Sequence, residues 1–478
     1  MERLRQSRAG RPAGSDPVTT PAQQQNAMML ASLLGIGEDE AAERLNATVL
    51  ITTEDSWKAL WAGELEALLR RTVTTRRTAG GAVPDVEVVV GRAMARTHAR
   101  PVFVDLDEKG VTVTGVSSAK RGSGRPHGLF AAAAACAATA AVLRVALDDP
   151  GMPDVRMPLS LAFDDLGVPC DAIERPLILK DAFLAGAGAV AHGFLHAARH
   201  LDLRGELSIV DPKPVAAGVL NRCLYLQEED VDRDKAEALA SRAQPHFPAL
   251  RLVPVVDDFR QVVRRPEGPP ELVFTTVDSR AVRRSIQMEM PHRIVDGSTT
   301  DATGVIVHSN TLPTEQACLA CIYRHVPQED ARERAIAEAL GVDQAVLRNV
   351  YIDEATANQI AARYPGKVDA AEIVGLAYDT MFRRLCGQQA ITTAEGRQVL
   401  APFAFVSCWA GVLMTVELLR MAHGGYPTNY WSVDPWNGPV GRARTVRGKA
   451  ENCPFCSLPG LQAAIRGQWP SSAWPVED

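Results

Sequence analysis

The sequence predicts an α/β protein with mostly parallel sheets, arranged as two successive α/β units. Two observations support this class. Short apolar segments alternate with helix-length segments along most of the chain, and 46% of the residues are hydrophobic while 23% are charged, as in ordinary globular proteins. The length of 478 residues predicts two to four domains at roughly 100 to 200 residues per domain. The composition excludes a disordered, collagen-like or coiled-coil chain.

The first α/β unit is predicted over residues 28–150. Residues 1–27 are polar and lack periodicity, so they predict a disordered arm. The break at 149–153, with two prolines and a glycine, predicts the first domain boundary. The elements expected in this unit are a first helix, strands over 47–51, 86–90 and 102–104, a helix over 56–69 and an alanine-rich helix over 129–147.

The second unit is predicted over 172–326 and 390–460. Its β-α-β alternation implies right-handed crossovers and a mostly parallel sheet. Residues 327–389 interrupt it with three predicted amphipathic helices, which we interpret as an insertion. The other elements expected are strands over 182–184, 207–210 and 251–256 and helices ending at 200 and spanning 234–243 and 405–421. Because each unit ends in a helix of small residues, the two suggest a duplicated fold.

Charge and hydropathy narrow the function classes. The 57 acidic and 51 basic residues give a net charge of −6, which provides no global positive field for nucleic acid or an anionic membrane. The uncharged stretches 128–143 and 400–416 fall short of the about 20 residues of a spanning helix, so buried helices are expected. No apolar segment follows the basic N-terminus as in a secretory signal, and we therefore expect a cytoplasmic protein without a membrane partner.

A glycine-rich loop indicates a nucleotide site. Gly186 and Gly188 lie in a G-x-G-x-x-A sequence between a predicted strand and helix, where backbone N–H groups can approach a phosphate. Asp211 ends the next strand, where a carboxylate can bind ribose hydroxyls. Tight strand-to-helix turns use the same glycines, so the loop alone would be a weaker indication than the pair of features.

The residues after Asp211 favour ATP over a dinucleotide. Arg222 and Lys235 are cations suited to a triphosphate, and Asp278 is a carboxylate suited to Mg²⁺. Each of these charges taken singly would more often be a solvated surface residue. Their order along one nucleotide-binding unit is what indicates ATP, and an NAD enzyme is a more distant alternative.

Two C-x-x-C pairs far apart in the chain predict a metal site. Four thiolates at this spacing suit a closed, tetrahedral, structural Zn²⁺ that ties the C-terminal segment to the second unit. Two redox dithiols or a coincidence are the alternatives. The predicted ligands are Cys318, Cys321, Cys453 and Cys456.

The ordered residues over 177–456 resemble the ThiF/MoeB and ubiquitin-activating enzyme superfamily. The resemblance implies a Rossmann-like adenylation domain that activates the C-terminal glycine of a ubiquitin-like protein with ATP and Mg²⁺. It implies the following roles: Gly186 and Gly188 in the nucleotide loop, Asp211 on ribose, Asn221 in nucleotide binding, Arg222 and Lys235 on phosphates, and Asp278 on Mg²⁺. Two departures from the family pattern concern phosphate and metal contacts: Val219 replaces an asparagine and Lys213 replaces a second acidic residue.

The resemblance also assigns a role to the first unit. Its strand over 47–51 leads into Thr52 and Thr53 without a glycine loop, so we expect a degenerate adenylation-like domain that binds no nucleotide. Fusion of an inactive to an active unit resembles the eukaryotic activating enzymes, in which an arginine of the partner half contacts ATP. Arg44 is the residue we nominate for that contact.

Cys386 is the predicted thioester cysteine. It ends the predicted helix over 371–385, with Gly387 as its cap, in the region where ubiquitin-activating relatives hold their catalytic cysteine. Cys136 and Cys408 lie in small-residue helices and are expected to be buried. Cys223 stands where the family commonly has glutamine, and Cys170 lies in the predicted linker.

The function expected is activation of a ubiquitin-like protein and transfer of its thioester to a separate conjugating enzyme. Standalone bacterial proteins of antiviral conjugation operons are the relatives that this chain resembles. One rival is an adenylating enzyme for sulfur transfer or peptide modification, which needs neither a thioester cysteine nor an insertion. A non-catalytic scaffold is a second rival, and the retained Arg222, Lys235 and Asp278 disfavour it.

Overall fold

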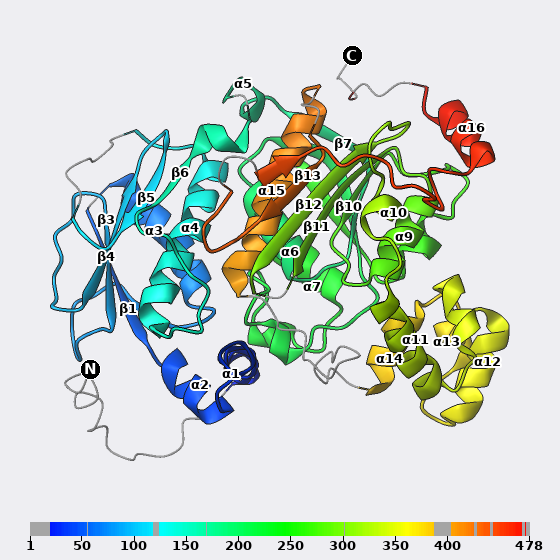
Figure 1. The fold of residues 1–478 in the computed structure, drawn as a ribbon, viewed down its shortest axis with the longest axis horizontal. Helices are drawn as coiled ribbons and strands as arrows, with labels where there is room; N and C mark the ends of the chain where they lie inside the picture. Colours follow the sequence, from blue (N-terminus) through cyan, green and yellow to red (C-terminus); the bar gives the residue numbers. More distant parts are fainter. Residues whose placement is uncertain are drawn as a thin grey trace.

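Two β-sheets lie side by side with a layer of helices between them (Figure 1). The computed structural model describes residues 20–54, 56–117, 124–168, 170–300, 302–386, 403–424, 428–439, 443–470 and 474. Buried side chains of both sheets and of the helices between them form one continuous hydrophobic core. The chain is therefore an α/β protein with two sheets, as predicted.

The N-terminal sheet has six strands in the order β2-β1-β3-β4-β5-β6. The first four are parallel, and β5 and β6 are antiparallel to their neighbours. Their bounds are β1 Thr48–Thr53, β2 Thr74–Arg76, β3 Val86–Val90, β4 Arg100–Leu106, β5 Gly110–Thr114 and β6 Leu159–Ala162. Because β6 pairs with β5, this sheet extends past the boundary that we predicted at 149–153.

The second sheet has eight strands in the order β14-β13-β12-β11-β10-β7-β8-β9. The five strands from β11 to β9 are parallel, and the remaining three pair antiparallel. Their bounds are β7 Leu177–Ala185, β8 Leu203–Val210, β9 Leu250–Val255, β10 Leu272–Thr275, β11 Arg293–Thr300, β12 Gly304–Thr311, β13 Tyr430–Val433 and β14 Arg444–Thr445. The predicted parallel sheet is confirmed, although β7 is longer than the three residues expected.

The two sheets share one topology. The order and direction of β2-β1-β3-β4-β5-β6 match those of β8-β7-β10-β11-β12-β13. Helices α3 (Trp57–Leu69) and α4 (Gly128–Leu147) occupy the places in the chain that α6 (Ala189–Ala198) and α15 (Ala404–Ala422) occupy in the second unit. The described residues of the N-terminal unit include no counterpart of β9 or of the long connection that leads to it. That connection carries Asn221, Arg222 and Lys235, so the duplication omits the predicted phosphate-binding segment.

Four helices, α3, α4, α6 and α15, fill the space between the sheets (Figure 1). Helices α4 and α15 are long and apolar enough to be candidate membrane spans, but 83% and 94% of their most apolar windows are buried inside the protein. They are core helices, as the sequence predicted. Small residues allow the close packing, because α6 and α15 cross at Gly193 and Gly411.

The N-terminus corrects one prediction. Helix α1 (Pro21–Leu34) begins after Thr20, whose hydroxyl accepts from the Gln23 N–H while the Gln23 side chain accepts from the Thr20 N–H. Residues 21–27 are therefore helical and not part of a disordered arm, whereas 1–19 lie outside the described residues. Helix α2 (Glu38–Leu45) follows, and α1 lies against the second unit.

The inserted segment has its own small core and packs beside α8 (Phe259–Val263) and α9 (Arg280–Met288). Its third predicted helix, over 371–385, is broken at Gly375, whose φ of +85° leaves the helical region. The segment contacts these two helices through Tyr351 OH to Ser285 Oγ at 2.9 Å, and through the Ala377 N–H to Asp258, just before α8, at 2.7 Å. Glu329 of the segment also forms ion pairs with Arg280 and Arg284 of α9, at 3.1 and 2.8 Å. The helices of the segment are α11 Pro327–Leu340, the 3-10 helix η6 Gln344–Asn349, α12 Glu354–Arg363, α13 Ala370–Ile373 and α14 Tyr378–Cys386.

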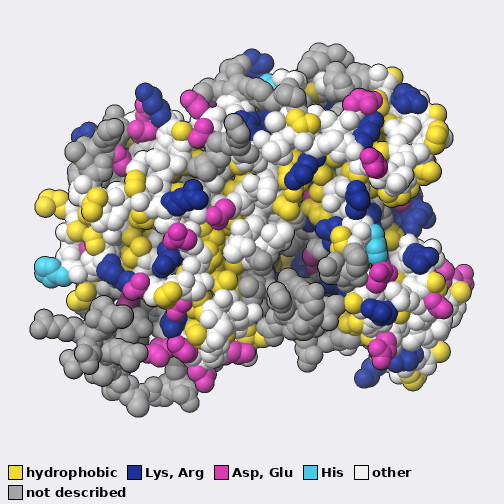
Figure 2. Space-filling model, viewed as in Figure 1, with side chains coloured by type: hydrophobic (Ala, Val, Ile, Leu, Met, Phe, Trp, Pro, Cys, Tyr) yellow, Lys and Arg dark blue, Asp and Glu magenta, His cyan; other side chains and the backbone are white. Residues whose placement is uncertain are grey.

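Acidic and basic side chains are interspersed over the face drawn in Figure 2, across both units. The remaining short helices connect the larger elements. They are η2 Phe163–Leu166, α5 Cys170–Ile173, η3 Ala217–Val219, η4 Glu228–Asp230, α7 Lys235–Ala243, η5 Gln244–His246, α10 Leu319–Ile322 and α16 Pro459–Gln468.

Candidate functional site

The glycine loop joins the end of β7 to the start of α6. Gly186 has a φ of +96°, and a Cβ there would lie 3.1 Å from Thr276 Oγ1, so this position requires glycine. Gly188 is the N-cap of α6, and a Cβ on it would meet no atom within 4 Å. Because no side chain caps this helix, its first N–H groups and the positive end of its dipole face the open space beside Gly188.

Asp211 holds the glycine loop against the end of β8. Its carboxylate accepts from the N–H of Ala187 at 2.8 Å and from the N–H of Lys213 at 2.9 Å. The side chain is only 5% exposed, and each oxygen keeps further lone pairs for a ligand hydroxyl. Asp211 is therefore fixed beside the loop, in a position to serve a bound nucleotide.

Two cations, the half-buried Arg222 and the buried Lys235, follow in the connection between β8 and β9. Arg222 Nη1 donates to Asn221 Oδ1 at 2.8 Å and to the Gly218 carbonyl at 3.2 Å. Burial lowers the pKa of Arg222, and Asp278 opposes that shift. Burial also lowers the pKa of Lys235, the first residue of α7, with Asp211 and Asp278 again acting in the opposite direction. Both cations thus lie where an anionic group would stabilise their charge.

Asp278 follows β10 and completes this set. Its side chain is half exposed, and its Oδ1 lies 3.8 Å from Nζ of Lys213. Lys213 occupies the position at which the family has a second acid, so a cation lies beside the carboxylate predicted to organise Mg²⁺. The site still includes the carboxylate oxygens that Mg²⁺ prefers, from Asp211 and Asp278.

The structure brings the predicted nucleotide residues together at one edge of the second sheet. They follow the carboxyl ends of β7, β8 and β10, where ligands bind in open parallel sheets. They are Gly186, Gly188, Asp211, Asn221, Arg222, Lys235 and Asp278.

Arg44 does not join them. It forms ion pairs with Glu40 and Asp149, both in the N-terminal unit. The arginine that the N-terminal unit places against the nucleotide segment is Arg71, which donates to the carbonyl of Leu220 at 2.5 Å. The structure therefore does not place Arg44 at the nucleotide site, and our nomination of this residue was wrong.

In the N-terminal unit, side chains occupy the place that corresponds to the glycine loop. Lys58 lies in the first turn of α3 with its side chain 3% exposed, and its Nζ is 3.5 Å from Glu54 Oε1. A Cβ on Gly91, which follows β3, would overlap both side chains. An ion pair thus fills the space that is open beside Gly188 in the second unit.

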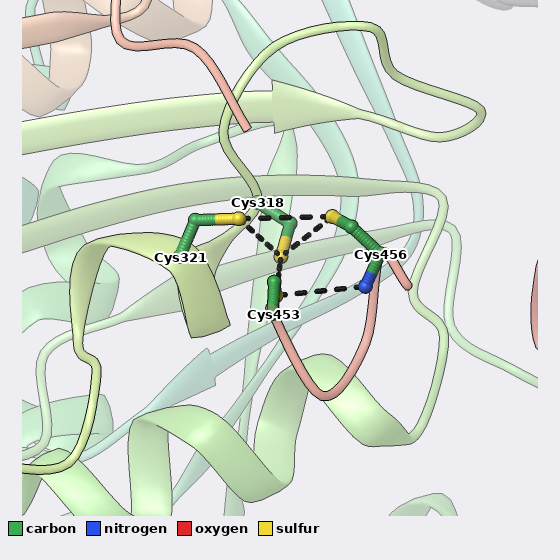
Figure 3. A group of neighbouring side chains, drawn as sticks. All are labelled: Cys318, Cys321, Cys453 and Cys456. Atoms are coloured by element: carbon green, nitrogen blue, oxygen red, sulfur yellow. Dashed lines mark hydrogen bonds between the residues drawn. The ribbon is translucent and has the colours of Figure 1, made fainter. Parts of the chain in front are cut away.

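The four predicted metal ligands converge in space (Figure 3). For an ideal tetrahedron with zinc–sulfur bonds of about 2.3 Å, sulfur atoms are roughly 3.8 Å apart. The observed spacing fits one tetrahedral ion and is too long for a disulfide. Four of the Sγ···Sγ distances are 3.6 Å for Cys318 and Cys321, 3.7 Å for Cys318 and Cys453, 3.7 Å for Cys321 and Cys456, and 3.4 Å for Cys318 and Cys456.

Both halves of the cluster come from short turns. Cys318 is the N-cap of α10, and the other pair lies in the turn between β14 and α16. Two backbone N–H groups donate to sulfur, from Ala450 to Cys321 at 3.4 Å and from Cys456 to Cys453 at 3.5 Å. Such donors favour thiolates, which are the form that binds a metal. The cluster is therefore compatible with zinc.

The remaining cysteines divide into two groups. Cys136, Cys223 and Cys408 are at most 1% exposed, and burial raises the pKa of Cys136 and of Cys223. The backbone of Cys386 ends α14, but its side chain, like that of Cys170, lies outside the described residues, as does Gly387. The predicted thioester cysteine is thus placed by its backbone alone.

Sequence reasoning missed three residues of the site region. Asn26 is buried against Asn221, although it falls in the segment predicted to be a disordered arm. The Thr20-x-x-Gln23 capping box was the signal that could have predicted a helix there. For Arg71 and Asp258, no local pattern indicated their contacts with distant segments.

Two models of known protein families match this chain. A family model described as "ThiF family" matches residues 180–455, more than half of the chain. The chain belongs to the ThiF family. A second model, described as "E1 N-terminal domain", matches residues 19–169. The Rossmann-like ThiF domain is thus preceded by an N-terminal domain, and an adenylating enzyme that binds ATP is the activity that the family supports.

Several solved structures are distantly similar to this ThiF protein. Escherichia coli MccB with ATP matches at 10% identity over 60% of this chain and 69% of that chain, with a TM-score of 0.35. The Microcin C7 biosynthetic enzyme MccB in complex with N-formylated MccA matches at 10% identity over the same shares, with a TM-score of 0.37. The search of curated proteins found no match.

Proposed function

We propose that this ThiF protein activates a ubiquitin-like protein. It adenylates the C-terminal glycine of that protein with ATP and then accepts the acyl group on Cys386 as a thioester. The observation that carries the proposal is a pair of cations, the half-buried Arg222 and the buried Lys235, on the unit that also presents an open glycine loop. Both cations interact electrostatically with Cys223 and with Asp278, so the two lie close to each other. Buried like charges are unfavourable without a counter-ion, and a triphosphate supplies one.

The nucleotide would be held by the groups around the glycine loop. The free N–H groups at the start of α6 suit a phosphate, and Gly188 leaves the space for it. Asp211 suits the ribose hydroxyls, and Asn221 orients Arg222. Asp278 would hold Mg²⁺, which supplies further compensation of phosphate charge when bound.

In the first step, a carboxylate oxygen of the substrate's C-terminal glycine attacks the α-phosphorus. The bond from that phosphorus to the oxygen bridging to the β-phosphate breaks, and pyrophosphate leaves. Negative charge accumulates on the leaving group, where Arg222 and Lys235 stabilise it. No protein nucleophile is needed for this step, because the substrate carboxylate is itself the nucleophile.

In the second step, the Cys386 thiolate attacks the acyl carbon of the adenylate, and AMP leaves with the electron pair of the broken carbon–oxygen bond. The inserted segment that carries α14 contacts the start of α8 in the nucleotide unit, because the Ala377 N–H donates to Asp258. The buried Cys136, Cys223 and Cys408 are poorly suited, because the thiolate is the reactive form and burial disfavours it. A separate conjugating enzyme would then take the acyl group from Cys386.

The test uses the full chain with candidate ubiquitin-like proteins that end in glycine. ATP–pyrophosphate exchange that depends on the added protein and on its terminal glycine is the expected result. A thiol-sensitive adduct should form on a non-reducing gel in wild type and in Cys170→Ala, and be lost in Cys386→Ala, while exchange persists in all three. No exchange with any such protein would refute the proposal.

An alternative outcome has a definite meaning. Exchange without an adduct in wild type would support direct transfer from the adenylate, as in sulfur transfer or peptide modification, and would remove the thioester step. An adduct that survives in Cys386→Ala but not in Cys170→Ala would reassign the thioester cysteine. These results separate the activity from the residue that we assign to it.

For the cysteine cluster we propose one structural Zn²⁺, with Cys318, Cys321, Cys453 and Cys456 as its ligands. The observed sulfur spacing and the N–H donors to two of the sulfurs support this assignment. The ion would join the turn before α16 to the segment after β12, and the packed apolar side chains around the cluster would close it to substrate.

A further inference from the structure

A chain of hydrogen bonds runs from the N-terminal unit to the Arg222 guanidinium. Asn26 Nδ2 donates to the Arg71 carbonyl at 2.6 Å, and Asn221 Nδ2 donates to Asn26 Oδ1 at 2.8 Å. Arg222 Nη1 then donates to Asn221 Oδ1 at 2.8 Å. Three successive hydrogen bonds therefore connect residues of α1 and of the turn after α3 to a predicted phosphate-binding cation.

The groups at the two ends of this series of hydrogen bonds determine which atoms of Asn26 and Asn221 donate and which accept. A guanidinium only donates, so Asn221 must present its oxygen to Arg222 and its NH₂ group to Asn26. A backbone carbonyl only accepts, so Asn26 must present its NH₂ group to Arg71 and its oxygen to Asn221. Rotating either amide by 180° would leave two bonds unmade. Asn26 and Asn221 are 4% and 2% exposed, so water would not readily replace those bonds.

The guanidinium of Arg71 holds the backbone of the same segment. It donates to the carbonyls of Leu220 at 2.5 Å, Leu224 at 2.6 Å and Leu226 at 3.3 Å. These carbonyls flank Asn221 and Arg222 on both sides. Burial lowers the pKa of Arg71, because removing its charge from water costs free energy. The hydrogen bonds to the three carbonyls offset that cost.

We propose that Asn26 and Arg71 are positioning residues through which the N-terminal unit sets the orientation of Arg222 at the nucleotide site. Asn26 acts on the Arg222 side chain through Asn221, and Arg71 acts on the backbone. An arginine that is oriented before the nucleotide arrives loses less conformational freedom on binding and needs no reorganisation during reaction. The inference rests on the proposed function only in that Arg222 contacts a nucleotide phosphate.

The test is a double-mutant cycle on ATP affinity, which needs no protein substrate. The variants are Asn26→Ala, Arg222→Ala and the double variant, with Gln24→Ala on the exposed face of α1 as a matched control. Asn26→Ala leaves the buried NH₂ group of Asn221 without its partner and frees that amide to rotate away from Arg222, so we expect about a ten-fold rise in the ATP dissociation constant. If Asn26 acts through Arg222, Asn26→Ala should weaken binding little further in the Arg222→Ala background.

A merely structural contact would behave differently. Additive losses in the double variant would overturn the proposal, as would unchanged ATP affinity in Asn26→Ala. Unfolding midpoints measured in parallel identify a variant that fails to fold, and Asn26→Gln provides a milder second variant with the same donor and acceptor. Coupling in ATP affinity without pyrophosphate exchange would leave the positioning role intact and refute the proposed activity. Failure of wild type to bind ATP would overturn both.

Discussion

Gly193 of α6 and Gly411 of α15 face each other where the two helices cross, and a Cβ on Gly411 would overlap the backbone of Gly193. The reverse contact is also too close for a side chain, because a Cβ on Gly193 would lie 2.5 Å from the Ser407 carbonyl oxygen. Helix α15 also packs on β11 and β12 of the same sheet. The crossing therefore fixes how close the glycine-loop helix can lie to the core helix.

Gly411→Ala should destabilise the protein. The methyl group meets backbone atoms on a facing helix, which cannot rotate away, so we expect a loss of about 2 kcal/mol or more, as for overpacked cores. Gly63→Ala is the matched control, since it also lies within a helix but faces open space, and it should be neutral or stabilise by up to about 1 kcal/mol. Urea unfolding of both variants measures the difference, and equal midpoints would contradict the prediction.

The sequence predicted the long core helices, whose side chains are almost all buried. Helices α4 and α15 were recognisable because nearly every side chain is small or apolar. The parallel strands β10 and β11 and the antiparallel strands β5, β6 and β12 were missed, because short strands carry little periodicity and their pairing depends on partners elsewhere in the sheet. The break at Gly375 was missed too, since a single glycine in a helical pattern is often tolerated.

For the candidate site, sequence order predicted the residues that follow consecutive strands of one unit. Gly188, Asp211 and Lys235 lie together because parallel strands end at the same edge. The contact of Asn26 with Asn221 spans 195 positions and joins two units, so no spacing rule could predict it. The wrong prediction for Arg44 has the same cause, because its ion pair with Asp149 depends on how α2 packs and not on a local sequence pattern.

Gly188→Ala should weaken nucleotide binding without harming the fold. The added methyl group meets no protein atom but occupies the space in front of the α6 N-terminus, where a phosphate would approach. We expect at least a ten-fold rise in the ATP dissociation constant, about 1.4 kcal/mol, with an unchanged unfolding midpoint. Unchanged ATP affinity would remove the phosphate role of the loop.

Gly186→Ala should show the opposite pattern in stability. Its φ of +96° is unfavourable for alanine, and its Cβ would crowd Thr276. We therefore expect a lower unfolding midpoint, with a free-energy loss of about 1–3 kcal/mol. Thermal unfolding compares the two loop variants directly. A Gly186→Ala protein as stable as wild type would show that the loop backbone is less constrained than the contacts indicate.

Removal of the metal should destabilise the C-terminal segment. Elemental analysis of wild type should find about one zinc per chain, and Cys453→Ser should lower both zinc content and the unfolding midpoint, because metal binding is coupled to folding. Cys136→Ala is the control, since that buried cysteine lies outside the cluster and its loss should leave the zinc in place. Zinc-free wild type of equal stability would contradict the assignment.

Asp258 makes the stability of the protein depend on pH. It is the residue just before α8, and its Oδ2 accepts from the Ala377 N–H of the inserted segment at 2.7 Å. Burial raises the pKa of this carboxyl to about 7, with Asp257 and Asp211 adding to the rise and Lys213 and the Ala377 N–H opposing it. The folded protein thus keeps a proton on Asp258 at pH values where the unfolded chain has lost it.

Between pH 4 and 7, the native state therefore binds more protons than the unfolded state. The free energy of unfolding consequently falls as pH rises through that window. Asp258→Asn keeps the shape and the acceptor for Ala377 but carries no charge at any pH. It should match wild type near pH 4 and exceed its stability above pH 7, by an amount on the order of 2–4 kcal/mol. Asp257→Asn is a comparison variant: it removes a smaller contribution to the raised pKa of Asp258 and leaves the burial, so it should shift the pH profile only slightly toward lower pH. Unfolding midpoints from pH 5 to 8.5 provide the measurement, and parallel profiles for wild type and Asp258→Asn would show that this carboxyl titrates in its ordinary range.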